Sequence, residues 1–297
     1  MADIKRVLAL GFFDGVHIGH AALMNMTKKR AAQLGAAASV LSFDNHPDQI
    51  VFGKPIQLLN STDGRTEIIR RIFGIDDVVV IHFDQSLMHM PWQEFLRTAT
   101  EDMGAVHLVI GRDFSCGWKG EGTAERISAW CAEHGFGCDV IEKVKLDGIV
   151  VSSTYIKQLI ADGEMERAVR YLGHPHMLVD SVRYGFRIGR KMGFPTINMC
   201  FPDGVLIPRR GVYCTKIYLE DGEYPSITNV GVRPTFGGTD DVTVETYILD
   251  FTGDLYGKKI SLGFFRFLRD ERRFDSSEAL AGQIKQDTEL TRKFFSI

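Results

Sequence analysis

The sequence has few cysteines and no pattern that would pair them. The five cysteines, at positions 116, 131, 138, 200 and 214, are an odd number, and no two form a Cys-x-x-Cys motif. This argues against a disulfide framework and against a cysteine-rich zinc site. We therefore expect a protein of a reducing compartment, the cytoplasm.

Long hydrophobic runs and an excess of positive charge are also missing. No stretch approaches the ~18 consecutive apolar residues of a transmembrane helix. The short apolar run at the N-terminus is interrupted by Asp14, and nothing like a cleavage site follows it. The formal net charge is -3, whereas proteins that bind nucleic acid carry a basic surface. These absences predict a protein that binds neither membranes nor nucleic acid.

The composition is that of an ordinary globular protein, and the length of 297 residues predicts two domains. In the first half, apolar runs of strand length alternate with helix-like stretches. Several runs are continuous Val, Ile and Leu, as in strands buried on both faces, which predicts βαβ units and a mostly parallel sheet. The predicted strands are 7–10, 37–43, 77–83, 107–111 and 138–144, and the predicted helices are 20–34, 61–73, 91–103 and 122–134.

The pattern changes after residue 150. Two short helices over 151–173 lead to Gly173 and Pro175, where we place the domain boundary, giving domains 1–175 and 176–297. Short β-rich segments separated by Gly, Pro and Asp then predict a small antiparallel barrel or sandwich. Asp275 and Glu278 resemble a capping box that opens a C-terminal helix. The β-rich segments are 211–219, 224–231, 242–249 and 260–267.

The stretch GFFDGVHIGH, residues 11–20, follows the first predicted strand. In open parallel sheets ligands bind at the carboxyl ends of strands, and the amides at a helix N-terminus favour anions. Imidazoles at His17 and His20 could therefore stabilise charge on a phosphate. A surface turn would give the same spacing, and so would a zinc site with His46 or His82 as a further ligand. The spacing alone leaves all three interpretations open.

Further motifs follow in a fixed order. They are LSFDNHP (41–47), GRDFSCGWKGEG (111–122), VSSTYIKQLIADGEMERAVRYLG (151–173), GRKMGFPTIN (189–198), GVY (211–213), TNVGVRPTF (228–236) and VETYILDFTGDLYGKKI (244–260). Together with GFFDGVHIGH, this set resembles the prokaryotic bifunctional riboflavin kinase/FAD synthetase family. The resemblance covers nearly the whole chain and implies a Rossmann-like, HIGH-type nucleotidyltransferase domain of α/β class, followed by a small antiparallel β-barrel with a C-terminal helix.

For the first domain, the resemblance implies transfer of AMP from ATP to FMN, which gives FAD and pyrophosphate. His17 and His20 are the implied catalytic residues. Phe43, Asp113 and Phe114 are the implied flavin-binding residues. The implied ATP-binding residues are Gly11, Phe13, Asp14, Gly15, His17, His20, Ser152, Ser153, Thr154 and Lys157.

Three departures from the family pattern fall in this domain. Lys157 stands where arginine is usual, so the planar fork that grips phosphate is lost. Ser115-Cys116 replaces Arg-Phe, and Asn45 replaces a proline. They motivate the alternative of a riboflavin kinase with a degenerate adenylyltransferase domain. A flavin-binding or regulatory protein without turnover is a second alternative.

For the second domain, the resemblance implies phosphorylation of riboflavin by ATP. Glu245 is the implied general base, and strand alternation places it on the face opposite residues 242, 244, 246 and 248. Thr196 and Asn198 are the implied Mg²⁺ ligands, since their oxygens suit that ion. The implied ATP-binding residues are Gly185, Gly189, Gly193, Pro195, Thr196 and Asn198, while Asn229, Arg233 and Arg269 are implied around nucleotide and flavin.

The resemblance also implies the partners of the protein. ATP is the co-substrate in both steps, riboflavin, FMN and FAD are substrates or products, and Mg²⁺ assists each step. We expect a cytoplasmic monomer or weak homo-oligomer with small-molecule partners only.

Overall fold

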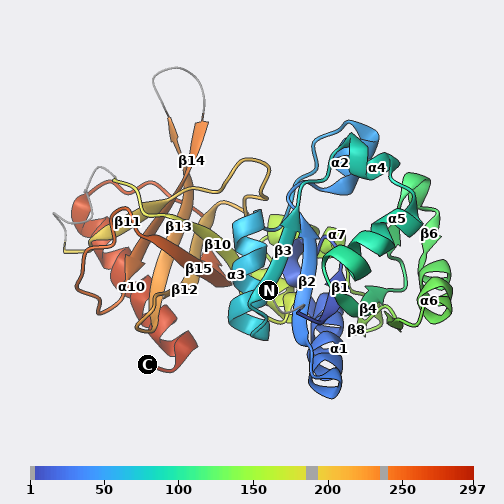
Figure 1. The fold of residues 1–297 in the computed structure, drawn as a ribbon. Coiled ribbons are helices and arrows are strands. Elements are labelled where there is room, and N and C mark those ends of the chain that lie inside the picture. Colours follow the sequence, from blue (N-terminus) through green and yellow to red (C-terminus); the bar gives the residue numbers. More distant parts are fainter. Residues whose placement is uncertain (1–3, 185–192, 235–239) are drawn as a thin grey trace. The chain divides into compact units, whose positions relative to one another are not determined.

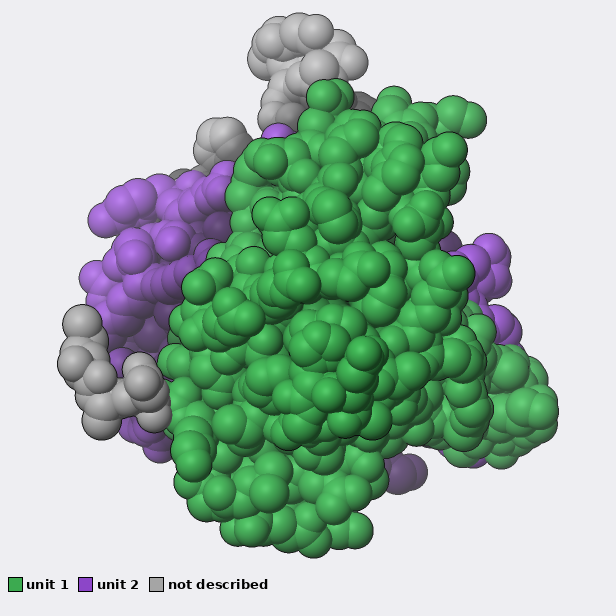
Figure 2. All heavy atoms as spheres, turned by 45° about the vertical axis from the view of Figure 1, so that its right-hand side comes forward, with its two compact units in different colours: residues 1–58, 65–153 green, residues 59–64, 154–297 purple. Residues whose placement is uncertain are grey.

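The computed structural model describes residues 4–184, 193–234 and 240–297 (Figure 1). The chain forms two compact units, coloured separately in Figure 2. One holds residues 1–58 and 65–153, and the other holds residues 59–64 and 154–297. The predicted domain boundary after residue 175 stays a prediction.

The first unit is built on a parallel sheet with the strand order β3-β2-β1-β4-β7. The order reverses at β1, which lies between β2 and β4, so the carboxyl end of β1 is the point where open sheets of this kind bind ligands. Residues 7–10 of β1 are at most 1% exposed, as predicted for a strand covered on both faces. The strands are β1 (Arg6–Leu10), β2 (Ala37–Phe43), β3 (Asp77–Ile81), β4 (Ala105–Gly111) and β7 (Gly137–Ile141).

The helices of the first unit connect these strands in βαβ fashion. Two short ones, α2 (Pro47–Phe52) and α4 (Gln85–His89), follow β2 and β3 and were not predicted. Five or six residues are too few to show helical periodicity. The longer helices are α1 (Ile18–Leu34), α3 (Thr62–Phe73), α5 (Trp92–Arg97), continued by a π-helical turn (Thr98–Asp102), and α6 (Ala124–Glu133). Minor elements are η1 (Asp14–Val16), η3 (Trp118–Gly120), β5 (Ser115–Cys116), β6 (Gly122–Thr123), β8 (Lys145–Leu146) and β9 (Ile149–Val150).

The second unit contains an antiparallel sheet of six described strands, in the order β10-β15-β12-β13-β14-β11. A backbone bridge between Arg183 and Asn198 joins its two edges, with an N···O distance of 2.8 Å. The predicted antiparallel barrel is thereby confirmed, although β10 and β11 were not predicted. The strands are β10 (His176–Ser181), β11 (Thr196–Met199), β12 (Gly211–Tyr218), β13 (Glu223–Pro234), β14 (Asp240–Ile248) and β15 (Lys259–Arg269).

Buried hydroxyl groups line part of the barrel interior. Thr215 lies 2.8 Å from both Ser226 and Thr228, and Thr228 lies 2.9 Å from Thr246, measured between hydroxyl oxygens. All four side chains are fully buried. Because each hydroxyl can both donate and accept, this chain satisfies polar groups that would otherwise be costly inside a barrel.

Three helices complete the second unit: α7 (Ser153–Ala161), α8 (Met165–Leu172) and α10 (Ser277–Phe295). The predicted C-terminal helix is confirmed, but its predicted cap is wrong. Ser276, not Asp275, is the N-cap, and its hydroxyl accepts a hydrogen bond from the amide of Ala279 at 3.1 Å. In the described part of the chain, no helix has both the length and the apolar character needed to cross a membrane.

Candidate functional site

The loop after β1 has an unusual backbone. Phe13 and Val16 have φ values of 59° and 41°, in the left-handed region that side chains disfavour, above all β-branched ones. Gly11 has no room for a side chain, because a Cβ there would lie 2.8 Å from the Phe13 ring. Backbone strain of this kind gathers at ligand sites, where surrounding structure maintains it. The loop is therefore a candidate ligand site.

His17 and His20 lie together at the start of α1. His17 is the N-cap, and its Nδ1 accepts a hydrogen bond from the amide of His20 at 3.3 Å. The two rings stack with centroids 3.6 Å apart. Burial, and secondarily the neighbouring His17, holds the pKa of His20 well below its usual value. His20 is thus a neutral imidazole, and its buried Nδ1 has no hydrogen-bond partner among the described residues.

The second predicted ATP-binding segment reaches the same loop through Ser153. Its hydroxyl donates to the carbonyl oxygen of Asp14 at 2.9 Å, although the two residues are 139 positions apart. Ser152 precedes it, while Thr154 and Lys157 lie on α7 in the second unit. The structure therefore brings the loop of residues 11–20 and the start of the SST motif together.

Arg65 on α3 is a buried residue at this site that sequence reasoning missed. Its side chain is 2% exposed, its Nη2 donates to the carbonyl of Phe43 at 2.6 Å, and its guanidinium lies 4.1 Å from the Phe12 ring centroid. Burial lowers its pKa to about 10, against the opposing effect of Asp14 and Asp44. Arg65 therefore connects the loop after β1 with the end of β2. Nothing in the sequence distinguishes it from the other arginines of α3.

A cavity of about 590 Å³ opens beside this loop. It brings the three predicted flavin-binding residues, Phe43, Asp113 and Phe114, together with Phe12 and the departure Ser115-Cys116. Burial raises the pKa of the Cys116 thiol to about 12, so that wall carries an uncharged thiol. The rest of the wall is mainly apolar and aromatic, as expected for a pocket that takes a flat ring system. It consists of His46, Pro47, Asp48, Val51, Phe83, Leu87, Met88, Phe95, Gly117, Trp118, Lys119 and Gly120.

The histidines considered as further zinc ligands make other contacts. His82 Nδ1 lies 2.7 Å from Asp44 Oδ2, and His46 packs against the Phe12 ring. Across residues 4–184, 193–234 and 240–297, no group of three or more His, Cys, Asp or Glu side chains is placed to hold a metal ion. The zinc interpretation therefore finds no ligand set in the described residues.

In the second unit, strand pairing aligns three predicted kinase residues. Asn198 on β11 lies directly opposite Glu245 on β14, and Asn229 on β13 lies opposite Glu245 on the other side. Directly paired residues present their side chains to the same face of a sheet. Val244 and Thr246, which flank Glu245, are fully buried on the other face, whereas Glu245 is half-buried. Glu245 and two polar amides therefore share one face.

Thr196 and Pro195 line a second cavity, of about 560 Å³. Thr196 is two residues before Asn198 on β11 and shares its face. The stacked rings of Tyr184 and Tyr256, with centroids 4.2 Å apart, also line the cavity. Gly193 has a φ of 84°, in the region open mainly to glycine, while Gly185 and Gly189 lie outside the described residues. Arg233 lies near the end of β13.

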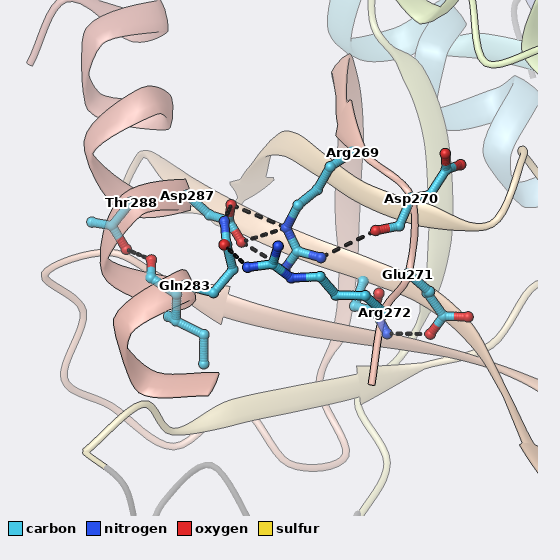
Figure 3. Close-up of polar contacts among 9 residues, drawn as sticks. Arg269, Asp270, Glu271, Arg272, Gln283, Asp287 and Thr288 are labelled. Atoms are coloured by element: carbon cyan, nitrogen blue, oxygen red, sulfur yellow. Dashed lines mark hydrogen bonds and ion pairs between the residues drawn. The ribbon is translucent and has the colours of Figure 1, made fainter. Parts of the chain in front are cut away.

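Arg269, at the end of β15, is held by an acidic residue of α10 (Figure 3). Its Nη2 lies 2.8 Å from Asp287 Oδ2, its Nε also donates to that carboxylate, and Gln283 Nε2 donates to Asp287 Oδ1 at 2.7 Å. Asn229 donates to Glu271 Oε1 at 3.0 Å, two residues beyond Arg269. The predicted flavin-side residues Asn229 and Arg269 therefore each donate to a carboxylate, that of Glu271 and that of Asp287 respectively.

The fold and its two sites define a protein with two nucleotide-using halves. The FAD synthetase family model matches residues 1–155, and the riboflavin kinase family model matches residues 172–295. The bifunctional riboflavin kinase/FMN adenylyltransferase of Listeria monocytogenes is 33% identical, over 99% of this chain and 94% of the relative. That of Pseudomonas fluorescens is 32% identical, over 96% of this chain and 92% of the relative. The chain belongs to the bifunctional riboflavin kinase/FMN adenylyltransferase family.

A solved structure shares the fold over almost the whole length. It is a protein from Streptococcus pneumoniae described as a macrolide-efflux protein, with a TM-score of 0.81 and 28% identity. The match covers 98% of this chain and 95% of that protein. Both halves of the fold thus occur together in that protein.

Proposed function

We propose that the protein phosphorylates riboflavin to FMN with one ATP and then adenylylates FMN to FAD with a second ATP. Membership of the bifunctional family supports both steps over the kinase-only alternative. The observation that carries the proposal is that each unit assembles its own set of site residues. The first has the His17–His20 loop beside an aromatic cavity, and the second has Glu245 between two amides. We assign adenylyl transfer to residues 1–175 and phosphorylation to residues 176–297.

In adenylyl transfer, an oxygen of the FMN phosphate attacks the α-phosphorus of ATP. A P–O–P bond forms between the two phosphates, and the bond from the α-phosphorus to the departing pyrophosphate breaks. The chemistry needs alignment and stabilisation of negative charge rather than a protein nucleophile. The strained loop, the amides at the start of α1 and the N–H groups of His17 and His20 supply donors, while the aromatic cavity holds the isoalloxazine ring.

In the kinase step, Glu245 accepts the proton of the ribityl 5′-hydroxyl as that oxygen attacks the γ-phosphorus of ATP. The new ester bond forms as the bond between the β,γ-bridging oxygen and the γ-phosphorus breaks, and ADP leaves. The half-buried position of Glu245 suits a base that must meet a substrate hydroxyl. Asn198 and Asn229 on either side can orient the reacting groups.

Thr196 and Asn198 would hold Mg²⁺ at the kinase site. They offer a hydroxyl and an amide oxygen on one strand face, the hard ligands that suit an ion that keeps most of its own water. The ion would neutralise charge on the ATP phosphates. We propose that Mg²⁺ would do the same in the adenylyl-transfer step. We further propose that the protein is cytoplasmic, which its five free cysteines support, and that it has no nucleic-acid partner, which its slightly negative net charge supports. We also propose that it is a monomer or a weak homo-oligomer.

One experiment tests the pair of activities. Purified protein is incubated with riboflavin, ATP and Mg²⁺, and the flavins are separated by chromatography over time. FMN should appear first and FAD should follow. FMN that accumulates without FAD at high enzyme concentration would establish the kinase-only alternative. Bound riboflavin without release of ADP would indicate a binding protein.

A further inference from the structure

The segment from Gly117 to Gly120, at the wall of the first cavity, contains a lysine in an unfavourable backbone conformation. Lys119 has a φ of 53° and a ψ of 22°, in the left-handed region. Gly117 and Gly120 also have positive φ, which costs a glycine nothing, whereas a residue with a Cβ is disfavoured there. Folding alone would favour glycine at position 119. A residue held in a strained backbone conformation on a cavity wall points to a role toward a ligand.

The charges on the cavity wall single out the same residue. Among the described residues that line this cavity, Lys119 is the only lysine or arginine. The wall carboxylate of Asp113 lies 3.2 Å from Lys143, and that of Asp48 lies 4.0 Å from His46. Lys119 itself forms no ion pair within the described part of the chain. An unpaired ammonium is thus available to a ligand.

The ammonium of Lys119 lies near an anchored aromatic ring. Its Nζ is 5.5 Å from the centroid of the Trp118 ring, and that ring stacks on His89 of α4 at 4.3 Å. The amide of Trp118 donates to the carbonyl of Met90 at 3.1 Å. The lysine is therefore carried by a loop that is anchored to the end of α4.

The proposed reaction determines which end of the cavity takes the phosphate of FMN and which end takes the flavin ring. The FMN phosphate must reach an α-phosphorus held by the loop of residues 11–20, and Phe12 brings that loop into the cavity wall. The isoalloxazine ring then extends toward the remaining wall, and its electron-rich groups are the carbonyls and nitrogens of the pyrimidine ring. We propose that Lys119 binds this pyrimidine edge and so selects flavin rings for the adenylyl-transfer site; this inference rests on the proposed function.

The test measures FAD formation from FMN and ATP by the full-length protein. Lumiflavin, which has the ring but no ribityl chain or phosphate, serves as a competitive inhibitor that the kinase cannot phosphorylate. For Lys119→Met, both the KM for FMN and the Ki of lumiflavin should rise about five- to tenfold, the loss expected for a charge-assisted hydrogen bond. For Lys119→Arg, which keeps the positive charge, both the KM and the Ki should stay within about threefold of the wild-type values.

Two further variants separate binding from folding. Lys119→Gly should show the same loss of affinity with a thermal midpoint no lower than the wild type, because glycine suits the left-handed backbone. Lys145→Met, at an exposed lysine of β8 that does not line the cavity, should change nothing. Unchanged KM and Ki in Lys119→Met would overturn the proposal, and so would a rise in the KM for FMN alone, which would indicate a phosphate contact. If the wild-type protein makes no FAD, the proposed function fails instead.

Discussion

Arg269 at the end of the last barrel strand and Asp287 on α10 form a nearly buried ion pair, with Asp287 only 2% exposed. The guanidinium meets the carboxylate through both Nε and Nη2, which is the strong two-point arrangement for these groups. The pair joins the C-terminal helix to the strand that runs beside β12. Its loss should therefore be felt in the stability of the barrel.

Asp287→Ala should lower the free energy of unfolding of the second unit by about 2–4 kcal/mol, because it leaves the Arg269 charge partly buried without its partner. Urea denaturation, followed by a spectroscopic signal from the barrel, would measure this change in unfolding free energy. Asp270→Ala is the matched control, since Asp270 pairs with Arg209 in an exposed ion pair that should contribute no more than about 1 kcal/mol. An equal loss of unfolding free energy in both variants would show that burial does not make the Arg269–Asp287 pair more important for stability than the Arg209–Asp270 pair.

Glu245→Gln should abolish FMN formation while leaving FAD formation from supplied FMN within about twofold of the wild type. Glutamine keeps the size of the side chain but cannot accept the hydroxyl proton, and general bases contribute on the order of 10²–10⁴ to a rate. Separate assays of the two steps would measure this. Glu223→Gln is the control, because that exposed glutamate lies at the start of β13 and pairs with Lys216. Loss of both activities in a folded Glu245→Gln protein would refute the assignment of two separate sites.

His20→Ala should have the reverse effect. Removal of one preorganised donor costs on the order of 10²–10³ in rate at sites that stabilise developing charge, so FAD formation should fall by that factor. Riboflavin phosphorylation should stay intact. Burial and His17 hold the pKa of His20 well below its usual value. Protonation of His20 should therefore not change the rate of FAD formation by the wild type when the pH is lowered from 8 to 6. A riboflavin kinase defect in the variant would contradict the prediction.

His176 on β10 should make the protein sensitive to acid. The residue is 1% exposed, both ring nitrogens lack hydrogen-bond partners among the described residues, and burial lowers its pKa to about 3. The unfolded chain takes up a proton below about pH 6.5, whereas the folded chain does so only near the lowered value. Stability therefore falls as the pH drops from about 6.5 toward 3.

The variant His176→Leu tests this effect. Between pH 7 and pH 5, the wild type should lose about 2 kcal/mol more unfolding free energy than the variant, since each pH unit below the unfolded-state pKa costs about 1.4 kcal/mol. Chemical denaturation at the two pH values would measure the difference. His20, which also has a lowered pKa, is common to both proteins and cancels in the comparison. Parallel pH profiles would show that His176 does not carry the effect.

Sequence periodicity predicted the elements that are long or strongly patterned. The parallel strands of the first unit and the four long strands of the barrel fall where continuous apolar or alternating runs placed them. The four-residue β11 gave no such signal, because strand pairing rather than local preference forms it. The cap of α10 was wrong by one residue, since Asp275 and Ser276 are both good caps and only their backbone angles decide.

The family resemblance named residues that the structure brings together, but it gave none of their geometry. The His17–His20 stack, the Ser153–Asp14 contact and the pairing of Asn198 and Asn229 with Glu245 concern residues that the family resemblance named. The buried position of Arg65 could not be predicted, because an arginine that bonds to a distant carbonyl leaves no mark in its local sequence. The ion pair between Arg269 and Asp287 could not be predicted from the local sequence either.

The hydroxyl chain inside the barrel has a consequence for its outer surface. Thr246 and Thr228 pair across β14 and β13 on the inside, and their sequence neighbours Glu245 and Asn229 are paired on the outside. Since a slip of one residue would exchange the two faces of a strand, a threonine that finds its hydroxyl partner also keeps the glutamate outward. The hydroxyl contact inside the barrel thus helps to set the strand register outside it, and substitutions at Thr228 or Thr246 should weaken the register that aligns Glu245 with Asn229.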